Sequence, residues 1–113
     1  MKREFRLTKS LDYKRVRRLG KSYAHPLFVL VTNPSQGDNH TRIGITTGRS
    51  VGKAVDRNRA KRRIKALLEE YYPNIQSGWD IIVIVRQPMV AAPFETIRQT
   101  LENQFKRCHL FKA

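Results

Sequence analysis

The chain lacks most features that mark secreted, membrane or disulfide-stabilised proteins. Its single cysteine, Cys108, can form no internal disulfide, which fits a reducing cytoplasm. Its longest aliphatic run, residues 81–85, is far shorter than the roughly 20 apolar residues of a membrane span. The N-terminus has no apolar stretch that would make a secretory signal. We therefore expect a cytoplasmic protein without a membrane partner, with residues 1–113 forming one domain.

Acidic residues are scarce, and the imbalance is concentrated in one half of the chain. There are 9 Asp and Glu against 23 Lys and Arg, a formal net charge of +14. Residues 1–65 hold 18 basic and 4 acidic side chains, whereas residues 66–113 hold 5 of each. A charge asymmetry of this kind indicates a surface for a polyanion, and nucleic acid is the usual one.

The sequence also lacks a recognisable catalytic arrangement. His25, His40 and His109 have no metal-ligand spacing, and nothing in the sequence brings them together for acid–base chemistry. The acidic residues form no two-metal cluster, and neither a P-loop nor a dinucleotide glycine fingerprint is present. We expect the chain alone to be inactive, with no catalytic residue and no metal ligand of its own.

The hydrophobic pattern alternates between helix and strand periods. It predicts helices over Ser10–Gly20, over Ala54–Tyr72 and from Pro93 onward, and strands over Leu27–Thr32, Arg42–Thr47 and Trp79–Val85. We expect the first two strands to pair as a hairpin and the apolar third strand to be central. The order indicates an α+β fold, a small two-layer sandwich with three helices on a mixed sheet of about four strands. General statistics favour a right-handed crossover if the second helix joins parallel strands.

The second predicted helix carries the strongest functional signal. Six of the nine residues from Arg57 to Lys65 are cationic, and no acidic residue lies between them to offset the repulsion. The helix dipole near this N-terminus is also unfavourable for cations. The predicted core arc is Ala60, Ile64, Leu67, Leu68 and Tyr71. The remaining polar face favours phosphate binding, and no second apolar face is left for a lipid surface.

A second candidate surface lies on the first predicted helix. Tyr13 stands among cations, a combination typical of single-stranded nucleic-acid sites, where bases stack on rings and cations follow the backbone. Phe28 lies inside an apolar strand, so either a stacking role or a place in the core fits its position.

The basic segment resembles a known signature. Arg57-Asn58-Arg59 followed by Lys61-Arg62, and preceded by residues 52–55, is similar to the signature of the protein subunit of bacterial ribonuclease P. Residues 7–13, 42–46 and 80–86 match the same family, so the resemblance covers nearly the whole chain. It implies a left-handed βαβ crossover at the basic helix, and we adopt this expectation in place of the statistical default.

The resemblance also implies a role in a ribonucleoprotein enzyme. The RNA subunit would catalyse removal of the 5′ leader from precursor tRNA, with Mg²⁺ held mainly by the RNA and the substrate, and one protein would bind each RNA. The residues implied to face the catalytic RNA are Arg57, Asn58, Arg59, Lys61, Arg62 and Lys65. The residues implied to line a leader cleft between the first helix and the sheet are Tyr13, Arg17, Phe28, Val31, Arg49, Lys53 and Arg86.

Two departures from the family pattern shape these expectations. The family often has a second aromatic where this chain has Arg17, and Val31 offers no ring either, so we expect charge to take a larger share in leader binding. The alternative function is that of a ribosomal protein or RNA chaperone that binds structured RNA without turnover. Dependence on a 5′ leader would separate the two.

Overall fold

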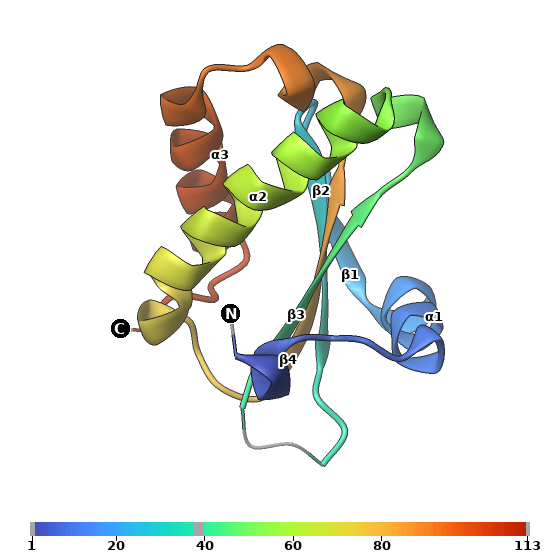
Figure 1. Ribbon diagram of the computed structural model, residues 1–113. Coiled ribbons are helices and arrows are strands. Elements are labelled where there is room, and N and C mark those ends of the chain that lie inside the picture. The colour runs from blue at the N-terminus through green and yellow to red at the C-terminus, as the bar shows by residue number, and fades with distance from the viewer. Residues whose placement is uncertain (1, 38–39, 113) are drawn as a thin grey trace.

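The computed structural model describes residues 2–37 and 40–112 and contains one mixed sheet with three α-helices (Figure 1). The elements are α1 (Ser10–Leu19), β1 (Lys21–Tyr23), β2 (Phe28–Pro34), β3 (Arg42–Thr47), α2 (Ala54–Tyr71), β4 (Trp79–Val85) and α3 (Phe94–Arg107). The predicted α+β class is confirmed. The three residues of β1 were missed, since so short a strand gives no readable alternation.

The strand order is β1-β2-β4-β3, with β2 antiparallel to both of its neighbours and β3 parallel to β4. The predicted hairpin of the second and third strands is therefore wrong, because β4 lies between them. Ile81, Ile82 and Val83 are fully buried although successive side chains point to opposite faces of the sheet. A strand that is apolar on both faces buries most area at the centre of the sheet, as predicted for this segment.

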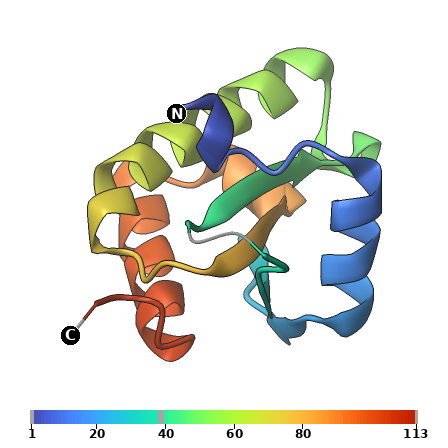
Figure 2. The same cartoon turned by 90° about the horizontal axis from the view of Figure 1, so that it is seen from below.

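The chain passes from β3 through α2 to β4, and this connection crosses over on one face of the sheet. Figure 1 shows the sheet nearly edge-on with α2 on one side, and Figure 2, seen from below, shows β3 at the edge of the sheet next to β4. To a viewer on the α2 side, with the parallel strands β3 and β4 pointing up, β4 lies to the left of β3. The crossover is thus left-handed, as the family resemblance implied and against the general preference for right-handed units.

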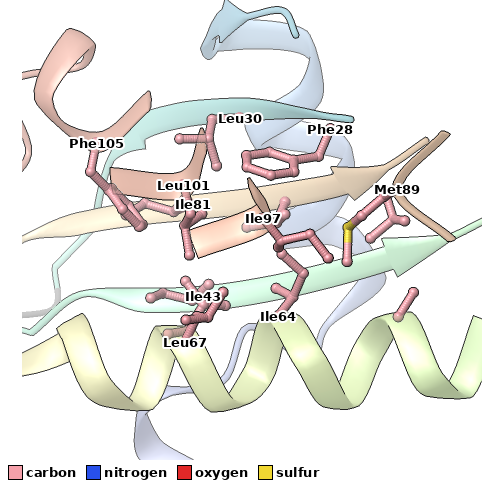
Figure 3. Close-up of a cluster of buried hydrophobic side chains, with 14 of the residues drawn as sticks. Phe28, Leu30, Ile43, Ile64, Leu67, Ile81, Met89, Ile97, Leu101 and Phe105 are labelled. Atoms are coloured by element: carbon pink, nitrogen blue, oxygen red, sulfur yellow. The ribbon is translucent and has the colours of Figure 1, made fainter. Parts of the chain in front are cut away.

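The two faces of the sheet are covered differently (Figure 1). α2 and α3 cover one face, and the main core lies beneath them, with Phe28, Ile64 and Phe105 fully buried there (Figure 3). The predicted core arc of α2 is confirmed for Ala60, Ile64, Leu67 and Leu68, while Tyr71 is half-buried. α1 lies on the opposite face and adds a partial third layer to the two that were predicted. Within residues 2–37 and 40–112, no helix is long and apolar enough to cross a bilayer.

Candidate nucleic-acid interface

The polar face of α2 divides into side chains that anchor the helix and side chains that face solvent. Arg57 is half-buried, and its Nη1 donates to the Gly52 carbonyl at 2.6 Å. Arg63 is also half-buried and donates to the Ala92 carbonyl at 3.1 Å. Between residues 57 and 65, the exposed polar residues of this helix are Asn58, Arg59, Lys61, Arg62 and Lys65. All five belong to the set that the resemblance assigned to the RNA subunit, whereas Arg57 is engaged inside the protein.

The entrance to α2 depends on Gly52. Its φ of 147° lies where L side chains are strained, and a Cβ there would approach Asp56 Oδ2 to 3.2 Å. Asp56 lies in the first turn of the helix, where a carboxylate interacts favourably with the helix dipole. This acidic residue offsets part of the positive charge at the start of the helix.

A pocket of about 460 Å³ lies over β3, between α1 and α2, and we call it the β3 pocket. The α2 wall is formed by Asn58, Lys61, Arg62 and Lys65. Tyr13 of α1, together with Arg6 and Thr8 of the N-terminal segment, forms the opposite wall. Gly44 and Ile45 lie on its floor. Two surfaces that the sequence suggested separately, the basic helix and Tyr13, therefore meet in one pocket.

Tyr13 is held against the β3 backbone. A Cβ at position 44 would lie 2.1 Å from Tyr13 Oη, so the ring occupies space that only a glycine at position 44 leaves open. Burial raises the pKa of the Tyr13 phenol, and a hydrogen bond with the Ile45 backbone opposes that rise. The half-buried ring thus presents a fixed aromatic surface to the pocket rather than a freely rotating one.

The other predicted leader residues form a separate group. Arg49 and Lys53 follow β3, and Arg86 follows β4. Since β3 and β4 are parallel and Thr47 pairs with Val85, these exposed cations lie at the same end of the sheet. Arg17 is exposed on α1. None of these four residues lines the β3 pocket.

Phe28 and Val31 do not take the positions predicted for them. Phe28 is 0% exposed in the core beneath α2 and α3, on the face opposite α1 (Figure 3). Val31 does face α1, but it is 3% exposed beneath that helix. Both leader contacts are corrected, because neither side chain reaches a surface. Val29 lies on the α1 face of the same strand and is half-buried. Because successive side chains of a strand point to opposite faces of the sheet, the alternation along β2 places Val29 and Phe28 on different faces.

Magnesium prefers oxygen ligands and is often held by one or two carboxylates together with substrate phosphates. Among the residues that the structure describes, no group of three or more His, Cys, Asp or Glu side chains could hold a metal ion.

A comparison with known protein families gives a match over nearly the whole chain. A family model described as Ribonuclease P matches residues 1–109. The chain belongs to the ribonuclease P protein family. A ribonuclease P protein component from Herpetosiphon aurantiacus is 38% identical over 98% of this chain and 89% of its own length. One from Symbiobacterium thermophilum is 38% identical over 99% of this chain and 97% of its own length.

Solved ribonuclease P proteins have the same fold. The Staphylococcus aureus protein is 33% identical with a TM-score of 0.88, covering 96% of this chain and 98% of its own. The Thermotoga maritima protein is 32% identical with a TM-score of 0.81, covering 90% of this chain and 96% of its own. As a ribonuclease P protein component, this chain is part of the endoribonuclease complex that processes the 5′ end of tRNA, and ribonuclease P RNA is its partner.

Proposed function

We propose that the exposed residues of α2 contact ribonuclease P RNA and that the β3 pocket receives the 5′ leader of precursor tRNA. The observation that carries this proposal is the position of Tyr13 across the pocket from Asn58, Lys61 and Arg62. An aromatic ring opposite cationic side chains matches what an extended single strand offers, a row of bases and a row of phosphates.

The assignment of surfaces follows from how each group of residues is engaged. Arg59 is exposed on α2 outside the β3 pocket, where it is open to a large RNA surface. Lys61, Arg62 and Lys65 line the pocket and are exposed, so the leader and the catalytic RNA would share them. Arg17 and the cations at the carboxyl ends of β3 and β4 would contact phosphates beyond the pocket. Arg57 contributes by fixing the start of α2.

The remaining parts of the proposal concern the whole complex. Cleavage takes place in the RNA subunit, Mg²⁺ is held mainly by that RNA and the substrate, and one protein binds each RNA. The chemical step then needs no side chain of this protein. Its charge raises the affinity for RNA and for the precursor, so less Mg²⁺ is needed to offset phosphate repulsion. A cytoplasmic location fits the single, unpaired cysteine.

The test is cleavage of a 5′-extended precursor tRNA at low Mg²⁺ in the presence of bacterial ribonuclease P RNA, with and without the chain. We expect cleavage at the mature 5′ end only when both components are present. Mature tRNA serves as the substrate control, and the chain without RNA serves as the protein control. Absence of stimulation with a competent RNA would favour the chaperone alternative, and cleavage by the chain alone would contradict an RNA-based active site.

A further inference from the structure

A buried network of charges lies beside the β3 pocket and takes no part in the contacts described so far. Asp80, the second residue of β4, is 0% exposed. Its carboxylate accepts two hydrogen bonds from Arg42 of β3, from Nε at 3.0 Å and from Nη2 at 2.9 Å. It also accepts a hydrogen bond from Arg15 of α1. One buried carboxylate therefore joins a helix to a strand.

Two further side chains, Asp12 and Asn33, belong to this network. Asp12 of α1 lies 3.5 Å from Arg15 Nη2 and 3.4 Å from Arg42 Nη1, so two carboxylates balance two guanidinium groups. Asn33 of β2 accepts from Arg15 Nη1 at 2.5 Å. Asn33 and Arg42 both pair with Asp80 across the sheet, which places the three side chains in one row. Side chains from three strands, β2, β3 and β4, thus hold α1 on the sheet.

The apolar contacts of α1 are too few to fix its orientation. Val16 is its only fully buried residue, whereas Leu11 and Leu19 are 77% and 58% exposed. Apolar contact is non-directional, so Val16 and the half-buried Tyr13, which packs on the same cluster, do not by themselves define the rotation of α1 on the sheet. Guanidinium groups bind carboxylates through a planar fork with defined geometry, and this directionality is what the apolar contact lacks.

Tyr13 lies between the two α1 members of the network, Asp12 and Arg15, so its position follows theirs. Its ring rests on Gly44, two residues after Arg42 on the same face of β3. We propose that Asp80 is a positioning residue which, through Arg15 and Arg42, holds α1 so that Tyr13 faces the cations of α2 across the β3 pocket. This inference deepens the proposed function and rests on it, since the property being positioned is the leader contact.

The test compares two arginines of one helix in the assembled holoenzyme. Arg15→Met removes the link to Asp80 but leaves the Arg42–Asp80 pair intact. Arg18→Met makes the same charge change at an exposed position of α1. The readout is the affinity for precursor tRNA divided by the affinity for mature tRNA. We expect this ratio to fall about tenfold for Arg15→Met, the order expected when a stacked base loses its ring, and to stay unchanged for Arg18→Met.

A second variant separates geometry from charge and guards against loss of folding. Arg15→Lys keeps the positive charge but loses the fork, so we expect the ratio to fall here too. Circular dichroism and urea unfolding identify which variants are folded. In a Tyr13→Ala background, neither Arg15 variant should lower the ratio further, because the ring being positioned is already gone. A purely structural role would instead give additive losses.

The outcomes distinguish this inference from the proposed function. If Tyr13→Ala alone leaves the ratio unchanged, the leader contact itself is wrong. If Tyr13→Ala lowers the ratio while a folded Arg15→Met or Arg15→Lys variant retains the wild-type value, the leader contact stands and the positioning role of the network is overturned.

Discussion

The two faces of the sheet are stabilised in different ways. Beneath α2 and α3, seventeen of the described residues form a continuous apolar core. Beneath α1, the buried apolar cluster has four members, and a row of charged side chains around Asp80 lies beside it. The first face gains its stability from apolar area, and the second depends on directional polar contacts. Both faces contribute to the β3 pocket, with Tyr13 from the α1 side and Asn58, Lys61, Arg62 and Lys65 from α2.

The largest expected effect breaks the apolar face. Phe28→Ala should lower the free energy of unfolding by about 3–5 kcal/mol, because it empties a fully buried site between the sheet and the helices. Val29→Ala on the opposite face should cost about 1 kcal/mol, since that side chain is half-buried. Urea unfolding of the free chain measures both. Equal losses of unfolding free energy would show that apolar packing stabilises the two faces to the same extent.

The next effect probes the α1 face through its aromatic residue. Tyr13→Ala should weaken binding of precursor tRNA to the holoenzyme by about 1–3 kcal/mol, because one base loses its stacking surface. Binding of mature tRNA should be unchanged. Leu11→Ala, at an exposed position of the same helix, is the control. Equal losses for precursor and mature tRNA would give Tyr13 a structural role only.

Gly44 offers a sharper version of the same comparison, because its substitution keeps the aromatic ring of Tyr13 but displaces it. Gly44→Ala should cost about 1–3 kcal/mol of stability, since the new Cβ would lie 2.1 Å from Tyr13 Oη. It should also reduce discrimination between precursor and mature tRNA. Gly48→Ala is matched, because its Cβ would meet nothing closer than Ser50 Oγ at 3.8 Å. Similar behaviour of both variants would argue against the close fit.

The smallest expected effect is on the salt dependence of RNA binding when a pair of cations is removed. The double variant Lys61→Ala, Arg62→Ala should reduce the slope of log K against log salt for RNA binding by about 0.7–0.9 for each phosphate that the protein no longer neutralises. The double variant Lys106→Ala, Lys112→Ala makes the same charge change in the C-terminal half at exposed positions and should leave the slope unchanged. A slope reduced equally by both pairs would mean that net charge, rather than the α2 face, controls RNA binding.

Local patterns predicted the elements well because they depend on near neighbours along the chain. The 3.6-residue period of α2 identified Ala60, Ile64 and Leu67 as core, and the apolar run at 81–85 identified a central strand. The hairpin prediction failed because it also assumed a local pairing. The true partner of both β2 and β3 is β4, which follows more than thirty residues after β3 begins, and no local signal encodes that choice.

The sequence also indicated the basic helix and Tyr13 but assigned them to different surfaces. For Phe28 it left both a core place and a stacking role open, and the family resemblance chose the stacking role; the structure puts the ring in the core, because the choice between the two faces of β2 depends on where α1 packs. The Asp80 network was missed for the same reason. Its charged members lie at positions 12, 15, 42 and 80, and their spacing carries no pattern. A charged residue in an otherwise apolar strand was the only hint of it.

By itself, the sequence determined the class of partner and the type of each main element. Both follow from quantities that add along the chain, namely net charge, its uneven distribution and the hydrophobic period. Tertiary structure alone decided which side chains meet, because strand order, the left-handed crossover and the packing of α1 depend on contacts between residues far apart in sequence. Those contacts place Tyr13 opposite the cations of α2 and bury Asp80 beneath α1, and together they form the β3 pocket on a surface rich in positive charge.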